Sequence, residues 1–343
     1  ASSVKEAVAS GEPESSCIVK ILNWQATVFG QGGGNGNDGY LKNAKVELIE
    51  TFTNKVLEET VSDDQGDFKF KTKRSTFPSV YTIKVKGGTD ISTGEEYQGY
   101  LENIVVNKEN ISGFTNVTPM TSLISKTIKL VMQTRALGAP ALSNLKKSFL
   151  RKMDLTLADI EIDHIKERNT KTMKLCIEIE IIKNFLSNLH NSISKEDVEY
   201  AVASVMIFCK YLKFAKYDSI HKIVKELLDT KKINFDEDML HSIAKTLNEL
   251  VLEVNNIKLK GFKYDMVKAV QINLAVAKLS SNKNKIELWT MISEDKFTKK
   301  ALSERKSVKI GLIDPKIDIK KMLEKNKSSE VVNKYHVINL RDR

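Results

Sequence analysis

The sequence predicts a chain of two parts: an antiparallel Greek-key β-sandwich of about seven strands, followed by an all-α helical bundle. Short stretches that alternate apolar and polar residues recur up to residue 118, separated by turn residues. After Thr118-Pro119, apolar residues recur every third or fourth position instead. Glycine clusters between residues 30 and 39 and becomes rare after Gly138. The predicted units are a flexible N-terminal arm (1–16), a β-sandwich domain (17–118), a helical domain (119–297) and an extended basic C-terminal segment (298–343).

The strands follow from period-two alternation, which places every second side chain on the same face. In the stretch from Asp67 to Lys71 the alternation is strict, and Phe68 and Phe70 are expected to point inward. Gly66 provides the positive φ that a tight hairpin requires just before this stretch. Further strands are predicted at 17–24, 45–50, 55–61, 80–85, 97–100 and 103–106.

The helices are marked by capping residues and by few breakers. Thr118 is a predicted N-cap with Pro119 at the first helical position. Ser194 with Asp197 resembles a capping box, and Asp236 is another predicted cap. Because the joints are short, neighbouring helices are expected to be antiparallel. Beyond the first helix, the apolar period predicts helices at 141–152, 168–191, 195–213, 217–229, 236–257, 262–281 and 284–292.

Composition limits the class of partner. The formal net charge of +10 comes mainly from lysine spread over many predicted helix faces. A nucleic-acid binder usually concentrates its basic residues with aromatics in a known module, so nucleic acid is not an expected partner. No apolar run is long enough for a transmembrane helix. The chain begins with Ala rather than Met, which fits a removed signal peptide and a secreted or cell-surface location, although any N-terminal trimming would look the same.

Residues that carry chemistry are sparse, and the protein is predicted not to be an enzyme. Cys176 and Cys209 lie in apolar helical stretches and are expected to be free buried thiols, with a disulfide between them as the alternative. Glu178 and Glu180 are two positions apart on a helix, so they face different ways and do not form an acid–base pair. The five histidines show no metal-binding spacing. No cofactor is expected, apart from a candidate calcium site.

Four stretches resemble a known type of module when taken together. They are 38–48, 62–70, 87–95 and 116–123. In this order they are similar to Greek-key modules of bacterial and algal cell-surface proteins, including carboxypeptidase regulatory-like and adhesin B-type repeat domains. The resemblance covers about residues 17–135 and implies a secreted or surface-exposed structural or adhesive protein, with a helical region after the module.

The calcium candidates come from the same resemblance. Related modules often carry an acidic calcium-binding loop after the second strand, but residues 50–55 lack the carboxylates for this. The remaining oxygen-rich positions are Asn35, Asn37 and Asp38 in the glycine loop and Asp63, Asp64 and Asp67 in the hairpin. Turn formation is the alternative reading, since aspartate stabilises turns through local hydrogen bonds.

Three Asn-x-Ser/Thr sequons, at Asn110, Asn116 and Asn326, are candidate glycosylation sites if the protein is secreted. Near the C-terminus, residues 308–313 and 335–338 resemble short extended segments. Such segments could add to an edge strand of this chain or of a neighbouring subunit, or lie on the surface as coil.

Taken together, the sequence predicts a non-enzymatic structural or assembly protein that is part of a secreted, cell-surface, appendage or virion assembly. Copies of itself or other assembly subunits are the expected partners, contacted through the sandwich. The expected interaction residues lie in and beside the glycine loop: Gly32, Gly33, Gly34, Asn35 and Tyr40. The alternative is a glycan- or peptide-binding surface module with a helical adaptor, in which an aromatic platform is formed by Trp24, Tyr40, Tyr97 and Tyr100.

Overall fold

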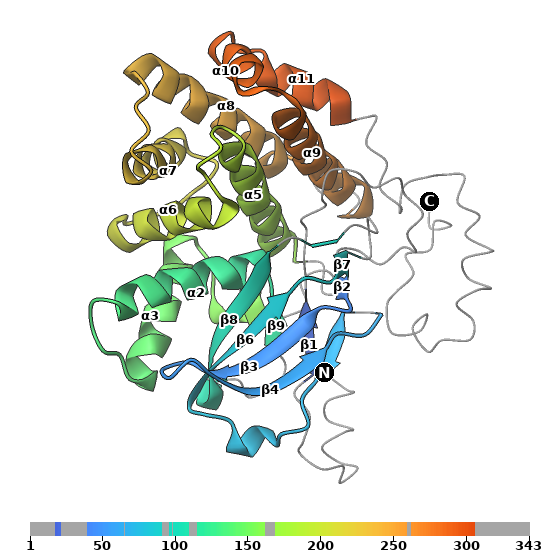
Figure 1. Cartoon of the computed structure of the whole chain (residues 1–343), viewed down its shortest axis with the longest axis vertical. Helices are drawn as coiled ribbons and strands as arrows, with labels where there is room; N and C mark the ends of the chain where they lie inside the picture. Colours follow the sequence, from blue (N-terminus) through green and yellow to red (C-terminus); the bar gives the residue numbers. More distant parts are fainter. Residues whose placement is uncertain are drawn as a thin grey trace, which may run out of the picture.

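Helices make up more than half of the residues that the structure describes (Figure 1). The computed structural model describes residues 18–21, 40–64, 66–90, 96–97, 99–109, 115–161, 169–258 and 262–305. The α-helices in this part are α2 (Pro119–Met132), α3 (Ala139–Lys152), α4 (Leu157–Glu161), α5 (Thr170–Ser187), α6 (Lys195–Phe208), α7 (Tyr217–Thr230), α8 (Glu237–Asn255), α9 (Phe262–Asn282), α10 (Lys285–Ser293) and α11 (Phe297–Glu304). Among them, none combines the length and apolarity needed to cross a membrane.

The strands are short and form three sheets. They are β1 (Ile18–Ile21), β2 (Leu41–Lys42), β3 (Lys45–Glu50), β4 (Lys55–Val61), β5 (Asp67–Lys69), β6 (Val80–Lys86), β7 (Thr89–Asp90), β8 (Tyr100–Val106) and β9 (Thr115–Val117). The largest sheet has four strands in the order β4-β3-β6-β8, and all its pairs are antiparallel. A second sheet has the order β5-β1-β9, in which β1 is antiparallel to β5 and parallel to β9. The third is the pair β2-β7.

The prediction of a seven-stranded Greek-key β-sandwich with a separate helical bundle is wrong. The strands are divided among three sheets, and one of the pairs is parallel. Helices cover one face of the four-stranded sheet, where Ile104 and Val106 of β8 join the apolar cluster of the helices. Leu101 and Val105 of the same strand lie in a second cluster on the opposite face. A strand that is apolar on both faces needs cover on both faces, and strand alternation alone does not say what provides it.

The second apolar cluster lies on the sheet face that points away from the helices. It contains Leu48 and Tyr81 from the four-stranded sheet. Aromatic rings extend it, because Phe70 and Phe77 are 6.2 Å apart and Phe77 and Tyr81 are 5.1 Å apart, both edge to face. All three sheets contribute to this cluster, and Phe70 is buried in it, in agreement with its predicted inward position.

Predictions about the helices are mostly confirmed. Strand β9 ends at Val117 and α2 begins at Pro119, where the sequence predicts the change of pattern. Thr118 and Thr121 form a capping box, with each backbone N–H donating to the other side chain. Ser194 and Asp197 form a second box, and Asp236 caps α8. At the other end the prediction fails in part, because α11 is helical over 297–304, where an extended segment was expected from residue 298.

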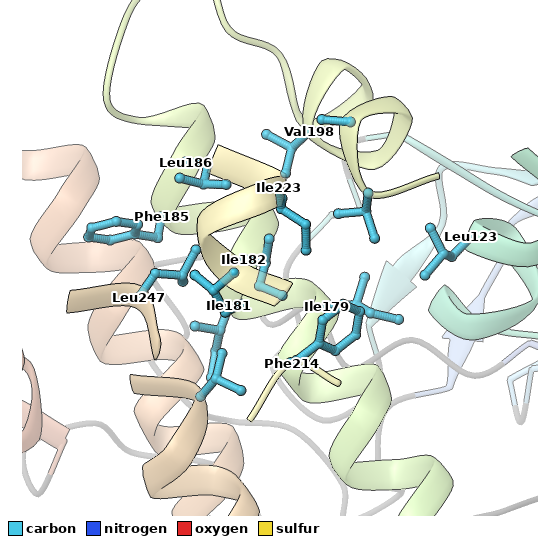
Figure 2. Packing of buried hydrophobic residues seen from close by; sticks show 14 of the residues in the cluster. Leu123, Ile179, Ile181, Ile182, Phe185, Leu186, Val198, Phe214, Ile223 and Leu247 are labelled. Atoms are coloured by element: carbon cyan, nitrogen blue, oxygen red, sulfur yellow. The ribbon is translucent and has the colours of Figure 1, made fainter. Parts of the chain in front are cut away.

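Helix α5 is at the centre of the helical layer. Figure 2 shows its Ile181, Ile182 and Phe185 packed against Ile223 of α7 and Leu247 of α8. Side chains are buried on every side of this helix from Cys176 to Leu186. A helical stretch that is buried all round has no solvent face, so Glu178, Glu180 and Lys183 are buried with the apolar residues.

Candidate assembly surface

The four-stranded sheet has two edges, and at the β8 edge helix α2 supplies hydroxyl groups. The backbone N–H of Glu102 donates to Oγ of Ser122 at 2.8 Å, and that of Ile104 donates to Oγ of Ser125 at 2.9 Å. The Glu102 carbonyl accepts from Oγ1 of Thr121 at 2.9 Å. The hydroxyl residues at the start of α2 therefore replace the neighbouring strand that this edge lacks.

Helix α3 adds a buried lysine to the same edge. Nζ of Lys146 donates to the Ile104 carbonyl at 2.6 Å and to Oδ1 of Asn103 at 3.0 Å. Burial lowers the pKa of Lys146 to about 8, although Glu161 and Glu109 oppose this shift. The β8 edge is thus closed by side chains from two helices.

A buried network of charges ties this closed edge to α5 and α6. Nζ of Lys126 lies 2.6 Å from Oε1 of Glu196 and 3.9 Å from a carboxylate oxygen of Glu199. Nζ of Lys183 lies 3.1 Å from Glu180 and 3.6 Å from Glu199. Burial opposes the charge of Lys183, but Glu180, Tyr97 and Glu199 together outweigh it and raise the lysine pKa. Since every member depends on its neighbours for compensation, this junction network is structural.

The sequence did not reveal this network. From their spacing, Glu178 and Glu180 were expected to face different ways, but the spacing does not show that both are buried. A signal was present in the Glu180–Lys183 spacing of three residues within an otherwise apolar stretch.

Burial raises the pKa of Glu178 to about 8, with Lys174 opposing the shift, so this carboxyl is protonated at neutral pH.

At the opposite edge, β4 is open. Within the described part of the chain β4 pairs with β3 alone. Seven large apolar side chains stand exposed among the described residues, and four of them lie on β4 or in the turn before it. Their exposed fractions are 46% for Phe52, 42% for Val56, 41% for Leu57 and 58% for Val61. We call these four residues the β4 edge surface.

Strand register explains why the β4 edge surface is uncovered. Val61 lies opposite Lys45 and Val56 lies opposite Ile49, so both valines point to the side of the sheet on which the helices pack. Helices α2 and α3 contact β8 at one edge of the sheet. Strand β4 is at the opposite edge, with β6 and β3 between it and β8 (Figure 1). The register shifts between Leu48 and Ile49, which leaves Leu57 as the extra residue of a β-bulge.

Both carboxylates of β4 already have partners. The Glu58 carboxylate accepts from the backbone N–H groups of Lys71 at 2.6 Å and Thr72 at 2.9 Å. Burial alone would raise the pKa of Glu58, but these hydrogen bonds outweigh it and hold the pKa below its ordinary value. Glu59 lies 2.7 Å from Lys45. What β4 offers to a partner is therefore backbone and apolar side chains.

Few devices protect this edge from pairing. Natural edge strands are usually short, rich in lysine, interrupted by proline or bulged. Strand β4 has seven residues, no proline and a single lysine, Lys55, so the bulge at Leu57 is its main irregularity. An open edge of this length with apolar neighbours favours the addition of another strand.

The calcium candidates in the hairpin take part in turn bonds. Oδ1 of Asp63 accepts from the N–H of Asp67 at 2.9 Å, and Gly66 donates to the Asp63 carbonyl at 3.0 Å. Asp64 lies in the same turn and is exposed, while Asp38 falls outside the described residues. In the part of the chain that the structure describes, no group of three or more His, Cys, Asp or Glu side chains is placed to hold a metal ion.

Of the predicted interaction residues, the structure describes Tyr40 alone. Gly32, Gly33, Gly34 and Asn35 lie outside the described residues. Tyr40 is buried in the apolar cluster of the helices.

The structure describes three of the four residues of the predicted aromatic platform, Tyr40, Tyr97 and Tyr100. Tyr40 and Tyr97 are both buried, and Trp24 lies outside the described residues. The ring of Tyr100 is half-buried, with the ammonium groups of Lys84 and Lys126 4.2 Å and 4.6 Å from its centre. Neither Tyr40 nor Tyr97 therefore exposes a ring on which a sugar could stack.

Two further predictions concern modification. Cys176 is a free buried thiol, as expected, and burial raises its pKa to about 12, whereas Cys209 is free but only half-buried. The Asn116 side chain is completely buried, so this fold leaves no room for a glycan there. Asn110 and Asn326 lie outside the described residues.

No protein-family model, no curated protein and no solved structure matches the chain. The resemblance to Greek-key surface modules therefore stays a prediction, based on the four sequence stretches that suggested it.

Proposed function

We propose that the protein is a non-enzymatic structural component that assembles with copies of itself by strand pairing at β4. The observation that carries this proposal is the β4 edge surface, in which an edge strand of seven residues coincides with four of the exposed large apolar side chains. Large exposed apolar groups that gather in one place usually mark an interaction site.

Pairing between two copies about a two-fold axis is the simplest arrangement. Antiparallel β4 strands would join two four-stranded sheets into one, with the same surface contributed by each copy. Each valine or leucine that becomes buried contributes roughly 1 kcal/mol, because about half of it is already covered. Association is therefore expected to be reversible and to depend on concentration.

The charges of β4 are compatible with this pairing. Glu58 and Glu59 would approach their counterparts in the second copy, and like charges directly opposite each other destabilise a sheet. Here the Glu58 carboxylate is held by the N–H groups of Lys71 and Thr72, and Glu59 is paired with Lys45. These contacts reduce the repulsion before a partner arrives.

We also propose a secreted, cell-surface, appendage or virion location for the assembly. The support is the resemblance of four sequence stretches to surface modules. Fractionation of the source cells with an antibody against the chain tests it, because recovery from the cell interior alone would contradict the location without affecting the role of β4.

The test of self-assembly is sedimentation velocity of the full chain over a range of concentrations. Val56→Lys and Val61→Lys are each expected to raise the dissociation constant of the dimer about tenfold, because each places a charge between the paired β4 strands. Ile286→Lys is the matched control, since Ile286 is 76% exposed on α10, away from the sheet.

Two results would overturn the proposal: a chain that stays monomeric at high concentration, or variants at β4 that assemble as well as the Ile286 control. A monomer whose β4 binds an extended peptide would instead support the alternative of a peptide-binding module, because the same edge can accept a single strand.

A further inference from the structure

A second exposed apolar site lies at the C-terminal end of α6, independent of the β4 edge. Phe208 is the last residue of the helix and is 86% exposed, and Tyr211 in the following loop is 60% exposed. Their neighbours Leu212 and Phe214 are buried. The loop thus anchors two apolar side chains in the core and projects two aromatic ones into solvent.

The backbone that carries these aromatics is well held. Nζ of Lys152 donates to the carbonyls of Met206 at 2.7 Å and Ile207 at 2.9 Å, which satisfies the end of α6. The N–H of Leu212 donates to the Lys152 carbonyl at 3.0 Å. Phe208 is therefore exposed on a backbone that these hydrogen bonds hold in place.

Lysines from three elements surround the aromatics. The ammonium groups of Lys210 and Lys213 lie 5.4 Å and 6.0 Å from the centre of the Tyr211 ring. Burial raises the pKa of the Cys209 thiol, and the charges of Lys152 on α3 and Lys222 on α7 oppose that rise. An effect on the Cys209 pKa requires that both lysines lie near this thiol. Positive charge from α3 and α7 therefore surrounds the loop.

We propose that this aromatic–lysine patch, formed by Phe208, Tyr211, Lys210, Lys213 and Lys222, docks the protein on an anionic lipid bilayer. Phe208 enters the boundary between headgroups and acyl chains, where burial of its ring is favourable. The lysines remain at the level of the headgroups and gain from the negative surface potential.

Charge and ring geometry favour lipid over the other anionic partner, single-stranded nucleic acid. Base recognition without sequence preference needs open aromatic faces on which bases stack. The Tyr211 ring already has two ammonium groups next to it, which leaves Phe208 as the single uncovered ring of the patch. One protruding phenyl ring among lysines is suited to insertion into a bilayer surface.

Vesicle flotation of the full chain tests the proposal. The probes are vesicles of phosphatidylcholine alone and vesicles containing about 30% phosphatidylserine. The chain is expected to float with the anionic vesicles, with less bound at high salt. Phe208→Ser and the double variant Lys210→Gln/Lys213→Gln should each reduce binding about tenfold. Ile286→Ser should bind as the unchanged protein does.

Thermal unfolding of each variant shows whether the fold is retained, which is expected because the changed side chains are exposed. The proposal is overturned if the chain floats equally with neutral vesicles, does not float at all, or floats as well when it carries Phe208→Ser. It is also overturned if a labelled oligouridine binds the chain with the same dependence on Phe208 while anionic vesicles do not.

Discussion

The two edges of the four-stranded sheet differ in how their unpaired backbone groups are covered. An edge strand exposes backbone N–H and C=O groups that another strand can use. At β8, Ser122 and Ser125 of α2 take up the N–H groups of Glu102 and Ile104, and helices cover the apolar side chains. At β4, the described chain supplies no such cover, and Val56 and Val61 stand exposed beside the open backbone.

This contrast separates what holds the fold together from what is left for a partner. The hydroxyls and buried charges at β8 stabilise the monomer, because removing one leaves a buried polar group unsatisfied. The apolar groups at β4 stabilise nothing in the monomer as long as they face water. Substitutions at the β8 edge should therefore change the free energy of unfolding, whereas substitutions at the β4 edge should change the dissociation constant of the assembly.

The largest effect is expected from Lys183→Met in the junction network behind β8. Glu180 and Glu199 would lose their shared buried cation, which lowers the free energy of unfolding by about 3–5 kcal/mol. Urea denaturation followed by circular dichroism measures this. Lys225→Met is the control, since Lys225 forms an exposed pair with Asp229 and its loss should cost less than about 1 kcal/mol. Equal effects would show that the network is not what secures the closed edge.

A pH dependence of about 4 kcal/mol is expected from Glu178 on the buried helix α5. Its pKa is about 8 in the fold against an ordinary 4.5. The unfolded chain releases this proton near pH 4.5 and the folded chain keeps it until about pH 8, so stability falls as the pH rises through this window.

Glu178→Gln should remove this loss of stability. The free energy of unfolding of the variant should therefore exceed that of the unchanged protein at pH 8 and equal it near pH 4.5. Urea denaturation at the two pH values measures the difference. A gain of the same size at both would contradict the assignment of the titrating group to Glu178.

Ser122→Ala tests the hydroxyl cover of β8 directly. The Glu102 N–H would lose its acceptor inside the protein, at a cost of about 1–3 kcal/mol in unfolding free energy. Ser281→Ala on the exposed side of α9 is the matched control and should change stability by less than about 0.5 kcal/mol. If Ser122→Ala were equally mild, α2 would not be the cover that β8 needs.

The smallest effect on stability is expected at β4. Val61→Lys should change the unfolding free energy of the monomer by less than about 0.5 kcal/mol, because this valine is more exposed than buried. Dilute samples, in which the monomer prevails, are the ones to measure. A loss of several kcal/mol would show that β4 serves the fold itself, and the contrast between the edges would fail.

The sequence predicted what local signals determine. Capping by Thr118, Ser194 and Asp236 depends on residues three positions away, and all three caps are present. Strand β4 is also recognisable from its own alternation. That it forms an edge is not, because the strand order depends on β6 and β8, which follow much later in the chain.

The predicted sandwich failed for the same reason. Alternation shows that Ile104 and Val106 need cover, but a helix and a second sheet satisfy an apolar face equally well. The junction network joins residues far apart in sequence: 70 positions separate Lys126 and Glu196. Only the packing of α2 against α6 brings them together.

Hydrogen exchange of the backbone amides, measured by mass spectrometry over a range of protein concentrations, tests the contrast between the edges most directly. Peptides that contain β8 should be protected at every concentration, because α2 closes that edge within one chain. Peptides that contain β4 should exchange faster in dilute samples and gain protection as concentration rises. Protection of β4 that is the same at all concentrations, or loss of protection at β8 on dilution, would contradict the account.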